Sequence, residues 1–149
     1  QSMALINTSW TLTLPQIATS VSLGIFWMRT AYSSLPAALS EAARVDGCSR
    51  FATLWRIYLP LSGPAIGTLA TLLFLFTWNE FLMPLVFVAQ NPAVQAAPLA
   101  LSFFAGNTRN LDPTVMAAAA VLVAVPIIIV YAILQRRFIA GIAAGAVKE

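Results

Sequence analysis

The side chains able to do chemistry are few in this sequence, and their types exclude most catalytic sites. The chain of 149 residues has 5 acidic and 8 basic residues, 1 cysteine and no histidine. General acid–base or nucleophilic catalysis needs a nucleophile and a base within hydrogen-bond reach, and these residues offer no such set. A lone cysteine without a CxxC pair or a histidine cluster predicts neither an internal disulfide nor a metal site. We therefore expect no catalytic residue, no metal and no cofactor.

A phosphate-binding loop is also missing from the sequence. No GxxxxGK[ST] pattern is present, and this pattern supplies the backbone amides and the lysine that hold the phosphates of ATP. If ATP drives this protein, another subunit has to hydrolyse it.

The densest polar segment is "EAARVDGCSRFATLWRIYLP", residues 41–60. Together with the residues just before it, "SSLPAALSEAARVDG" predicts a helix, because Ser33 or Ser34 can cap it and Pro36 fits its first turn. Gly47 stands where a left-handed residue commonly ends a helix.

A second short helix is expected from about Ser49 to Tyr58. Its large apolar side chains recur at i, i+3, i+4 and i+7 and so predict one apolar face, formed by Phe51, Leu54, Trp55 and Tyr58. Pro60 should end this helix, because proline lacks the N–H that continues helical bonding. Residues 34–60 therefore predict a hairpin of two short helices.

The hairpin lies between stretches that are apolar enough for a lipid bilayer. The composition is 60% hydrophobic and 9% charged, against about 25% charged in soluble domains, and the mean hydropathy is +0.84. Three stretches reach the roughly 20 residues that cross a bilayer: 11–32, 64–88 and 113–135. Pro84 should kink the second, since it cannot donate to the carbonyl of Glu80. We expect an all-α membrane protein with three transmembrane helices and the hairpin, in a single domain.

Positive charge is unevenly distributed about these spans. If the spans alternate in direction, most basic residues fall on one side of the membrane: Arg29, Arg44, Arg50, Arg56, Arg136, Arg137 and Lys148. Only Arg109 falls on the other side. Because basic loops favour the cytoplasm, segment 34–60 and tail 136–149 are predicted to be cytoplasmic. Loop 89–112, with a short interfacial helix at Leu99–Phe104, is predicted to face outward. The net charge of +3 thus indicates topology rather than binding to nucleic acid.

Two roles for the hairpin fit its residues alone. As an interfacial amphipathic element it would rest on lipid headgroups, with Glu41 and Arg44 as a helical i,i+3 pair. As a docking element it would meet a soluble partner, where the small Ala42 and Ala43 allow close approach and Glu41 meets a cation. Both roles stay open on physical grounds.

The spacing of residues in the hairpin resembles a known signature. Glu41-Ala42-Ala43, three residues, Gly47, nine residues, Ile57, one residue and Leu59-Pro60 is similar to the cytoplasmic signature of ABC importer permeases. The resemblance implies that the segment is the coupling helix, which inserts into a cleft on the ATP-hydrolysing subunit. The docking residues it implies are Glu41, Ala42, Ala43, Asp46, Gly47, Ile57, Leu59 and Pro60, with Glu41 paired to a basic residue of that subunit.

This resemblance extends over almost the whole chain. "TWNEFLMPL" (77–85) and "GIAAGAVKE" (141–149) look like the carbohydrate branch, specifically the second permease of maltose-type systems. Members of that branch have further spans ahead of this part. The resemblance therefore implies that the chain is a C-terminal portion of a type I importer permease fold. Because the chain begins with Gln and shows no signal peptide, we also expect the first residues of the natural protein to be missing. In the maltose system the tail reaches into the ATPase dimer interface, which implies a similar contact for Gly145, Ala146, Val147 and Lys148.

The resemblance also implies partners and a location. The partners are an ATP-binding subunit dimer, a second permease subunit that makes a heterodimer, and a periplasmic or extracellular solute-binding protein. The location is the cytoplasmic (inner) membrane of a bacterium or archaeon, in contact with lipid.

Asn79 and Glu80 are polar residues inside the second predicted span. A carboxylate at the centre of a lipid-facing helix costs about 2.5–3.5 kcal/mol, so Glu80 should face the bundle or a water-filled cavity. A structural hydrogen bond or ion pair with another span and a place along the substrate path both fit. Trp78 is interpreted as an aromatic residue of the membrane interface.

The leading hypothesis is a permease subunit of an ATP-driven importer for a sugar or oligosaccharide, working by alternating access. One alternative is an importer permease for a solute that is not a sugar. Another is a gradient-driven carrier, which would need internal repeats and acidic residues near the midplane, where only Glu80 qualifies. An intramembrane enzyme would need the catalytic set that this sequence lacks.

Overall fold

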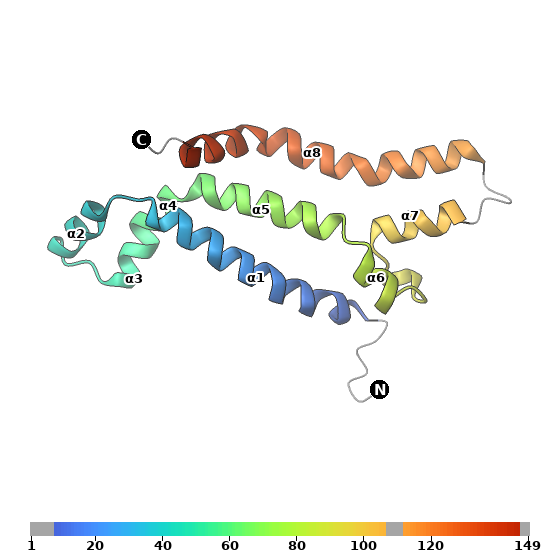
Figure 1. The fold of residues 1–149 in the computed structure, drawn as a ribbon, viewed down its shortest axis with the longest axis horizontal. Helices are drawn as coiled ribbons and strands as arrows, with labels where there is room; N and C mark the ends of the chain where they lie inside the picture. The colour runs from blue at the N-terminus through green and yellow to red at the C-terminus, as the bar shows by residue number, and fades with distance from the viewer. Residues whose placement is uncertain (1–7, 107–111, 147–149) are drawn as a thin grey trace, which may run out of the picture. The chain divides into compact units, whose positions relative to one another are not determined.

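Helices make up every regular element in the described part of the chain. In this computed structural model the described residues are 8–106 and 112–146, with side chains described as far as Leu134. Figure 1 shows the order of the elements, which are α1 (Ser9–Ser33), α2 (Ala37–Val45), α3 (Arg50–Thr53), the π-helical turn η1 (Leu54–Tyr58), α4 (Leu59–Leu61), α5 (Gly63–Trp78), α6 (Leu82–Phe87), the 3-10 turn η2 (Pro92–Val94), α7 (Ala97–Gly106) and α8 (Pro113–Ala146). The short helix predicted at Leu99–Phe104 is confirmed as part of α7.

The chain divides into two compact units. The first unit consists of Gln1–Ser20 and Leu72–Ile133, and the second of Val21–Thr71 and Leu134–Glu149. The long helices α1, α5 and α8 each contribute residues to both units. The hairpin predicted from the sequence belongs to the second unit, and Asn79 and Glu80 belong to the first.

Two of the described stretches are long and apolar enough to cross a membrane: Gly63–Phe87, with 25 residues, and Pro113–Leu134, with 22. The most apolar segment of the second stretch contains no buried residue, whereas the core helix of a soluble domain would be largely covered. Helix α1 also has 25 residues, but it is less apolar because threonine and serine recur along it. Length and apolarity together therefore support two spans from the structure alone.

Helices α1 and α5 pack closely within the second unit. A Cβ on Gly24 of α1 would lie only 3.8 Å from Cδ2 of Leu69 in α5. Trp27 donates from its indole Nε1 to the carbonyl oxygen of Ala65 at 3.0 Å. Small residues and side-chain hydrogen bonds of this kind hold helices together in lipid, where the hydrophobic effect between helices is weak.

The second predicted span is broken rather than kinked. Helix α5 ends at Trp78 and α6 begins at Leu82, with Phe81 at φ −120° and ψ −43° between them. The predicted kink at Pro84 is thus replaced by a break ahead of it. Pro84 lies in the first turn of α6, where a backbone N–H has no partner within the helix, so its missing donor is tolerated there.

The two serines predicted to cap the hairpin do not cap it. Ser33 ends α1 and donates to the carbonyl of Arg29 at 2.6 Å, while Ser34 donates to the carbonyl of Ala31 at 2.8 Å. Pro36 precedes α2 and offers no side-chain cap. Serine hydroxyls readily donate to backbone carbonyls three or four residues earlier, and here both serines form such bonds instead of capping α2.

Pro60 does not end the second helix of the hairpin, contrary to the prediction. Leu59 donates its N–H to the carbonyl of Leu54, five residues back, and α4 then continues through Pro60 to Leu61. The π-helical turn changes the register of the hydrogen bonds. Pro60 therefore occupies the first turn of a new helical segment, the position at which proline is tolerated.

Helix α8 extends beyond the predicted end of the third span at residue 135. Its backbone is helical as far as Ala146, which includes most of the segment predicted as a tail. Pro126 lies inside the helix.

Candidate functional site

The turn of the hairpin between α2 and α3 is built on Gly47. Its φ is +73°, the left-handed conformation that the sequence predicted and that glycine adopts without strain. The N–H of Gly47 donates to the carbonyl of Arg44 at 3.1 Å, and the N–H of Cys48 donates to the carbonyl of Ala43 at 2.9 Å. These two bonds satisfy carbonyls at the end of α2 in the pattern of a Schellman motif.

The next helix begins immediately after this turn. The Ser49 hydroxyl accepts a hydrogen bond from the N–H of Ala52 at 3.2 Å and so caps α3. Thr53 is buried and donates to the carbonyl of Ser49 at 3.0 Å. The hairpin is therefore fixed on both sides of its turn by local hydrogen bonds.

The signature residues fall into an exposed group and a covered group. Ala43 is 2% exposed, so it packs within the second unit. Ile57 and Leu59 are half-buried. The side chains that face outward are those of Glu41, Ala42, Asp46 and Pro60, together with the Gly47 turn. An exposed carboxylate beside an exposed alanine is therefore what the hairpin offers to a partner.

The apolar stripe predicted for the second helix is divided. Phe51 and Trp55 are 71% and 58% exposed, and their rings lie 6.2 Å apart. Tyr58 instead packs edge-on against Tyr32 at 5.7 Å. The physical reason is the π-helical turn, whose wider winding shifts Tyr58 out of line with the residues before it.

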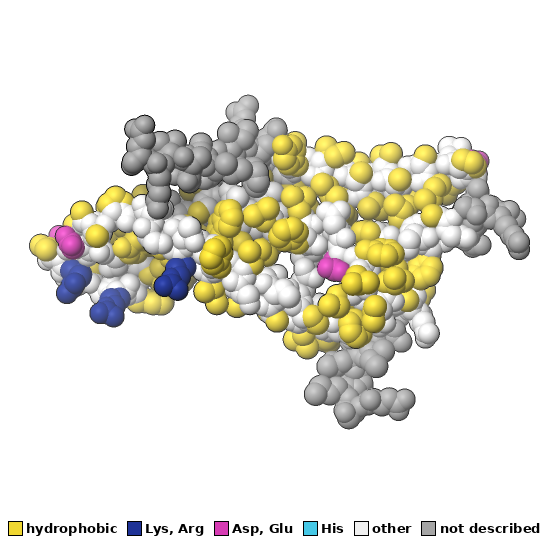
Figure 2. All heavy atoms as spheres, in the orientation of Figure 1, with side chains coloured by type: hydrophobic (Ala, Val, Ile, Leu, Met, Phe, Trp, Pro, Cys, Tyr) yellow, Lys and Arg dark blue, Asp and Glu magenta, His cyan; other side chains and the backbone are white. Residues whose placement is uncertain are grey.

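The arginine side chains that the structure describes all belong to the second unit, and they are Arg29, Arg44, Arg50 and Arg56. Figure 2 shows the dark blue spheres over α2, α3 and the neighbouring end of this unit, with acidic side chains beside them. All of these arginines are exposed.

In the first unit, the break between α5 and α6 is stabilised by Glu80. One carboxylate oxygen, Oε1, accepts a hydrogen bond from the N–H of Met83 at 3.2 Å, which satisfies a donor at the start of α6. Asn79 lies beside it and is exposed, and its amide donates back to the carbonyl of Leu75 at 2.8 Å. Within the described residues neither side chain bonds to another helix, and the bond to Met83 makes Glu80 act on its own segment.

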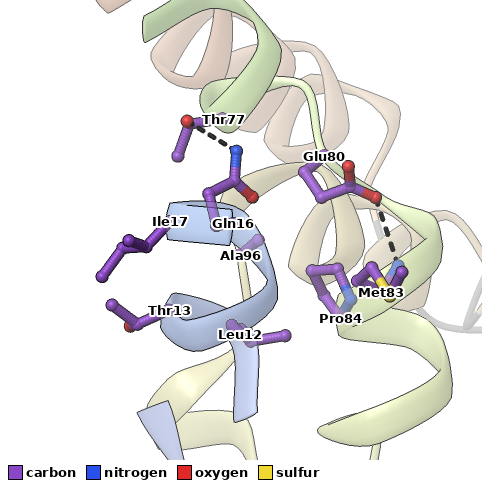
Figure 3. Close-up of a pocket in the computed structure, with 9 residues that line it drawn as sticks. All are labelled: Leu12, Thr13, Gln16, Ile17, Thr77, Glu80, Met83, Pro84 and Ala96. Atoms are coloured by element: carbon purple, nitrogen blue, oxygen red, sulfur yellow. Dashed lines mark hydrogen bonds between the residues drawn. The ribbon is translucent and has the colours of Figure 1, made fainter. Parts of the chain in front are cut away.

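Glu80 also lines a cavity of about 240 Å³ within the first unit. Figure 3 shows α1 on one side of this cavity and the break with α6 on the other. The Gln16 side-chain amide donates from Nε2 to the hydroxyl oxygen of Thr77 at 2.8 Å across 61 residues of sequence. The remaining lining is contributed by Leu12, Thr13, Ile17, Met83, Pro84 and Ala96.

Sequence reasoning missed the polar contacts between helices. Trp78 was interpreted as an interfacial aromatic, but it stacks on Phe74 at 5.6 Å and donates to the carbonyl of Val123 in α8 at 3.1 Å. Pro126 withholds its N–H from the carbonyl of Leu122, four residues earlier, and not from that of Val123. No feature of the sequence therefore indicated this contact.

Only some of the C-terminal residues implied to contact the ATPase are among those that the structure describes. The backbone of Gly145 and Ala146 lies at the end of α8. Val147 and Lys148 lie outside the described residues, as does Arg109.

Comparison with known proteins places the chain in a family. Residues 2–143 match the family described as "Binding-protein-dependent transport system inner membrane component". The chain belongs to this family. Its membership makes the protein part of a helical inner-membrane permease, in agreement with the resemblance found in the hairpin.

Relatives in the family carry names of sugar transport systems. The chain is 34% identical to the trehalose transport system permease protein SugB of Mycobacterium tuberculosis, over 99% of this chain and 54% of that protein. It is 34% identical to the trehalose/maltose transport system permease protein MalG of Thermococcus litoralis, over 96% and 51%. It is 37% identical to the arabinooligosaccharides transport system permease protein AraQ of Halalkalibacterium halodurans, over 98% and 51%. The chain thus spans about half the length of these relatives.

Proposed function

We propose that the chain is the C-terminal part of a permease subunit in an ATP-driven, binding-protein-dependent importer for a sugar or oligosaccharide. Membership of the family supports the importer, and the trehalose, maltose and arabinooligosaccharide names of the relatives support the class of cargo. The subunit itself forms the path and does not hydrolyse ATP. A gradient-driven carrier is disfavoured by the same family membership.

The proposed topology has three spans, with α1 as the first. Its length of 25 residues is enough to cross a bilayer, and its threonines and serines suit contact with other helices more than contact with lipid. The exposed arginines of the second unit support a cytoplasmic position of the hairpin, because basic segments favour that side of the membrane. The C-terminus is then cytoplasmic as well, and loop 89–112 faces outward.

The hairpin is proposed to be the coupling element. The observation that carries this role is its geometry: a Schellman turn at Gly47 fixes α2, and Glu41 and Ala42 are exposed while Ala43 is covered. An ATPase subunit would approach closely over the small side chain of Ala42. The Glu41 carboxylate would pair with a basic residue of that subunit.

The proposed mechanism is alternating access. Closure of an ATPase dimer on ATP would move the hairpin, and the attached spans would open the path outward to a solute-binding protein. Hydrolysis would reverse the movement. A second permease subunit would complete the path, and the C-terminal residues Gly145, Ala146, Val147 and Lys148 would reach the ATPase dimer.

A co-purification experiment on the whole permease tests the coupling role. The complete subunit is co-expressed with its ATPase and second permease, purified in detergent, and the ATPase that co-elutes is quantified. Glu41→Arg should abolish co-elution, because it places a cation against the proposed basic partner. Glu41→Gln should weaken co-elution, since it removes one charge from a charge-assisted contact.

The matched control for the amide variant is Asp112→Asn. Asp112 is also exposed and carries the same charge, but it lies outside the hairpin, and asparagine can still cap α8. Co-elution should be unchanged in this variant. If the unmodified permease is folded and no ATPase co-elutes, or if Glu41→Arg has no effect, the coupling role is wrong.

A further inference from the structure

Some hydrogen-bonding atoms of the residues that line the cavity of the first unit have no partner among the described residues. Glu80 Oε1 accepts from Met83, and no bond to the second oxygen, Oε2, occurs within the described residues. Gln16 donates through Nε2 to Thr77, and its side-chain oxygen, Oε1, has no partner in the same set of residues. The Thr77 hydroxyl accepts that bond and keeps its own hydrogen available for donation.

These atoms are held in place by the structure around them. The bond to Met83 orients the carboxylate at the break between α5 and α6. The bond between Gln16 and Thr77 joins α1 to α5. Glu80, Gln16 and Thr77 therefore line the same cavity with hydrogen-bonding side chains, and Figure 3 shows the Glu80 carboxylate turned toward Met83 and the Gln16 amide bonded to Thr77. Hydrogen-bonding side chains in defined orientations are what a ligand with several hydroxyl groups requires.

Apart from Thr13, whose hydroxyl donates to the carbonyl of Ser9, the rest of the lining is apolar. The side chains that lack hydrogen-bond donors are those of Leu12, Ile17, Met83 and Pro84. A pyranose ring has this same division, because its C–H faces are apolar and its rim carries hydroxyls. The volume of about 240 Å³ is below the roughly 300–1,000 Å³ of sites for drug-sized ligands, and it suits a single sugar ring better than an oligosaccharide.

A cation site is the competing interpretation, and the geometry disfavours it. A hard cation such as calcium takes about 6–8 oxygen ligands at close range. The cavity offers fewer oxygens and mainly apolar surface. A neutral polyol needs only hydroxyl-to-acceptor bonds, and those to a carboxylate are the stronger, charge-assisted kind.

We propose that this cavity is a cargo subsite, in which Glu80 and Gln16 accept hydrogen bonds from hydroxyls of one sugar ring while the cargo crosses the membrane. The subunit would thus contact its cargo directly. The inference rests on the proposed function. Glu80 would have two roles at once, since one oxygen holds α6 and the other binds sugar.

Protection of an introduced cysteine tests occupancy of the cavity. In a Cys48→Ser background, Thr77→Cys places a thiol in the cavity, and Thr19→Cys places one on the same unit outside it. The complete transporter, with its ATPase, second permease and solute-binding protein in lipid nanodiscs, is labelled with a small hydrophilic thiol reagent. Labelling of this subunit is followed by mass spectrometry with ATP, with and without trehalose, maltose or an arabino-oligosaccharide.

We expect the transported sugar to slow labelling of Thr77→Cys about tenfold when it is present at about ten times its Kd for the subsite. Labelling of Thr19→Cys should not change. Equal labelling of Thr77→Cys with and without a sugar that the complex transports would overturn the inference. Protection by sodium ion alone would overturn it in favour of a cation site.

Transport by reconstituted complexes gives a second, independent readout. Glu80→Gln keeps an acceptor for Met83 but removes the charge, so uptake should fall about tenfold, as expected when a hydrogen bond to a charged group is weakened. Thr77→Val should also lower uptake, whereas the identical change at Thr19 should not. The sugar affinity of the solute-binding protein, measured alone, should stay constant.

The outcomes separate this inference from the proposed function. If the unmodified complex takes up none of the three sugars, the proposed cargo is wrong and the subsite fails with it. If the unmodified complex transports sugar but Glu80→Gln and Thr77→Val transport it equally well, only the subsite is wrong.

Discussion

Replacement of Gly47 by alanine should loosen the hairpin by an amount that the structure allows us to work out. At φ +73° an alanine pays a backbone penalty of about 1–2 kcal/mol. No atom lies within 4 Å of the Cβ that the substitution would add, so steric contact contributes nothing further. Alanine also restricts the unfolded chain, which offsets about 0.4–1 kcal/mol. The expected net loss is about 1 kcal/mol.

Hydrogen exchange measures this loss locally. The N–H groups of Gly47 and Cys48 close the Schellman turn, and a loss of about 1 kcal/mol corresponds to about a fivefold increase in the open population. Amide exchange in peptides covering residues 37–49 of the complete permease should therefore accelerate about fivefold in Gly47→Ala. Peptides from α5 should exchange as before.

Asparagine provides the matched control at the same position. Gly47→Asn adds a larger side chain, yet asparagine populates the left-handed region much more readily than alanine. Exchange should therefore be slower in Gly47→Asn than in Gly47→Ala. If both variants accelerate exchange equally, or if neither does, the backbone conformation of residue 47 is not what holds the hairpin.

Two further predictions concern the first unit. Trp78→Phe removes the indole donor to the carbonyl of Val123. The free energy of unfolding should fall by about 0.6–1.7 kcal/mol, as measured for hydrogen bonds within membrane bundles, and thermal unfolding in detergent tests this. The control Trp10→Phe, at an exposed site, should leave the unfolding temperature unchanged. At the start of α8, hydrogen bonds from Thr114 lower the pKa of Asp112 from 3.8. The carboxylate therefore stabilises the helix fully above that unfolded-state value, and this contribution is lost as pH falls through the lower folded pKa. The amide exchange rate of the first turn of α8, divided by the rate in Asp112→Asn, should therefore rise as the pH is lowered. A ratio that stays constant with pH would show that the Asp112 carboxylate does not stabilise this turn.

Several parts of the hairpin were predictable because they depend on neighbouring residues. Gly47 adopts the left-handed conformation that its place after an alanine-rich helix indicated. The end of the second helix was not predictable in this way. Pro60 ends an ordinary α-helix, but the π-helical turn before it changes the hydrogen-bond register, and no local sequence rule predicts such a turn.

Less of the cavity than of the hairpin could be predicted from the sequence. Glu80 was singled out because a carboxylate in an apolar span requires a polar surrounding. Its surroundings were missed, because its partner Met83 contributes only a backbone N–H. Gln16, which lines the same cavity and bonds to Thr77, is far from Glu80 in sequence. The break ahead of Pro84, which directs Glu80 toward that N–H, replaced the kink that was expected.

The sequence by itself determined that the chain is helical, that it contains stretches for a membrane, and that a polar hairpin with a left-handed turn interrupts them. These properties follow from composition, periodicity and the conformational preferences of single residues. Only the tertiary structure decided which polar groups meet, as in the bonds from Gln16 to Thr77, from Trp27 to Ala65 and from Trp78 to Val123. Such pairs join residues on different helices, and their meeting depends on how the helices are rotated and spaced, which the preferences of individual segments do not specify.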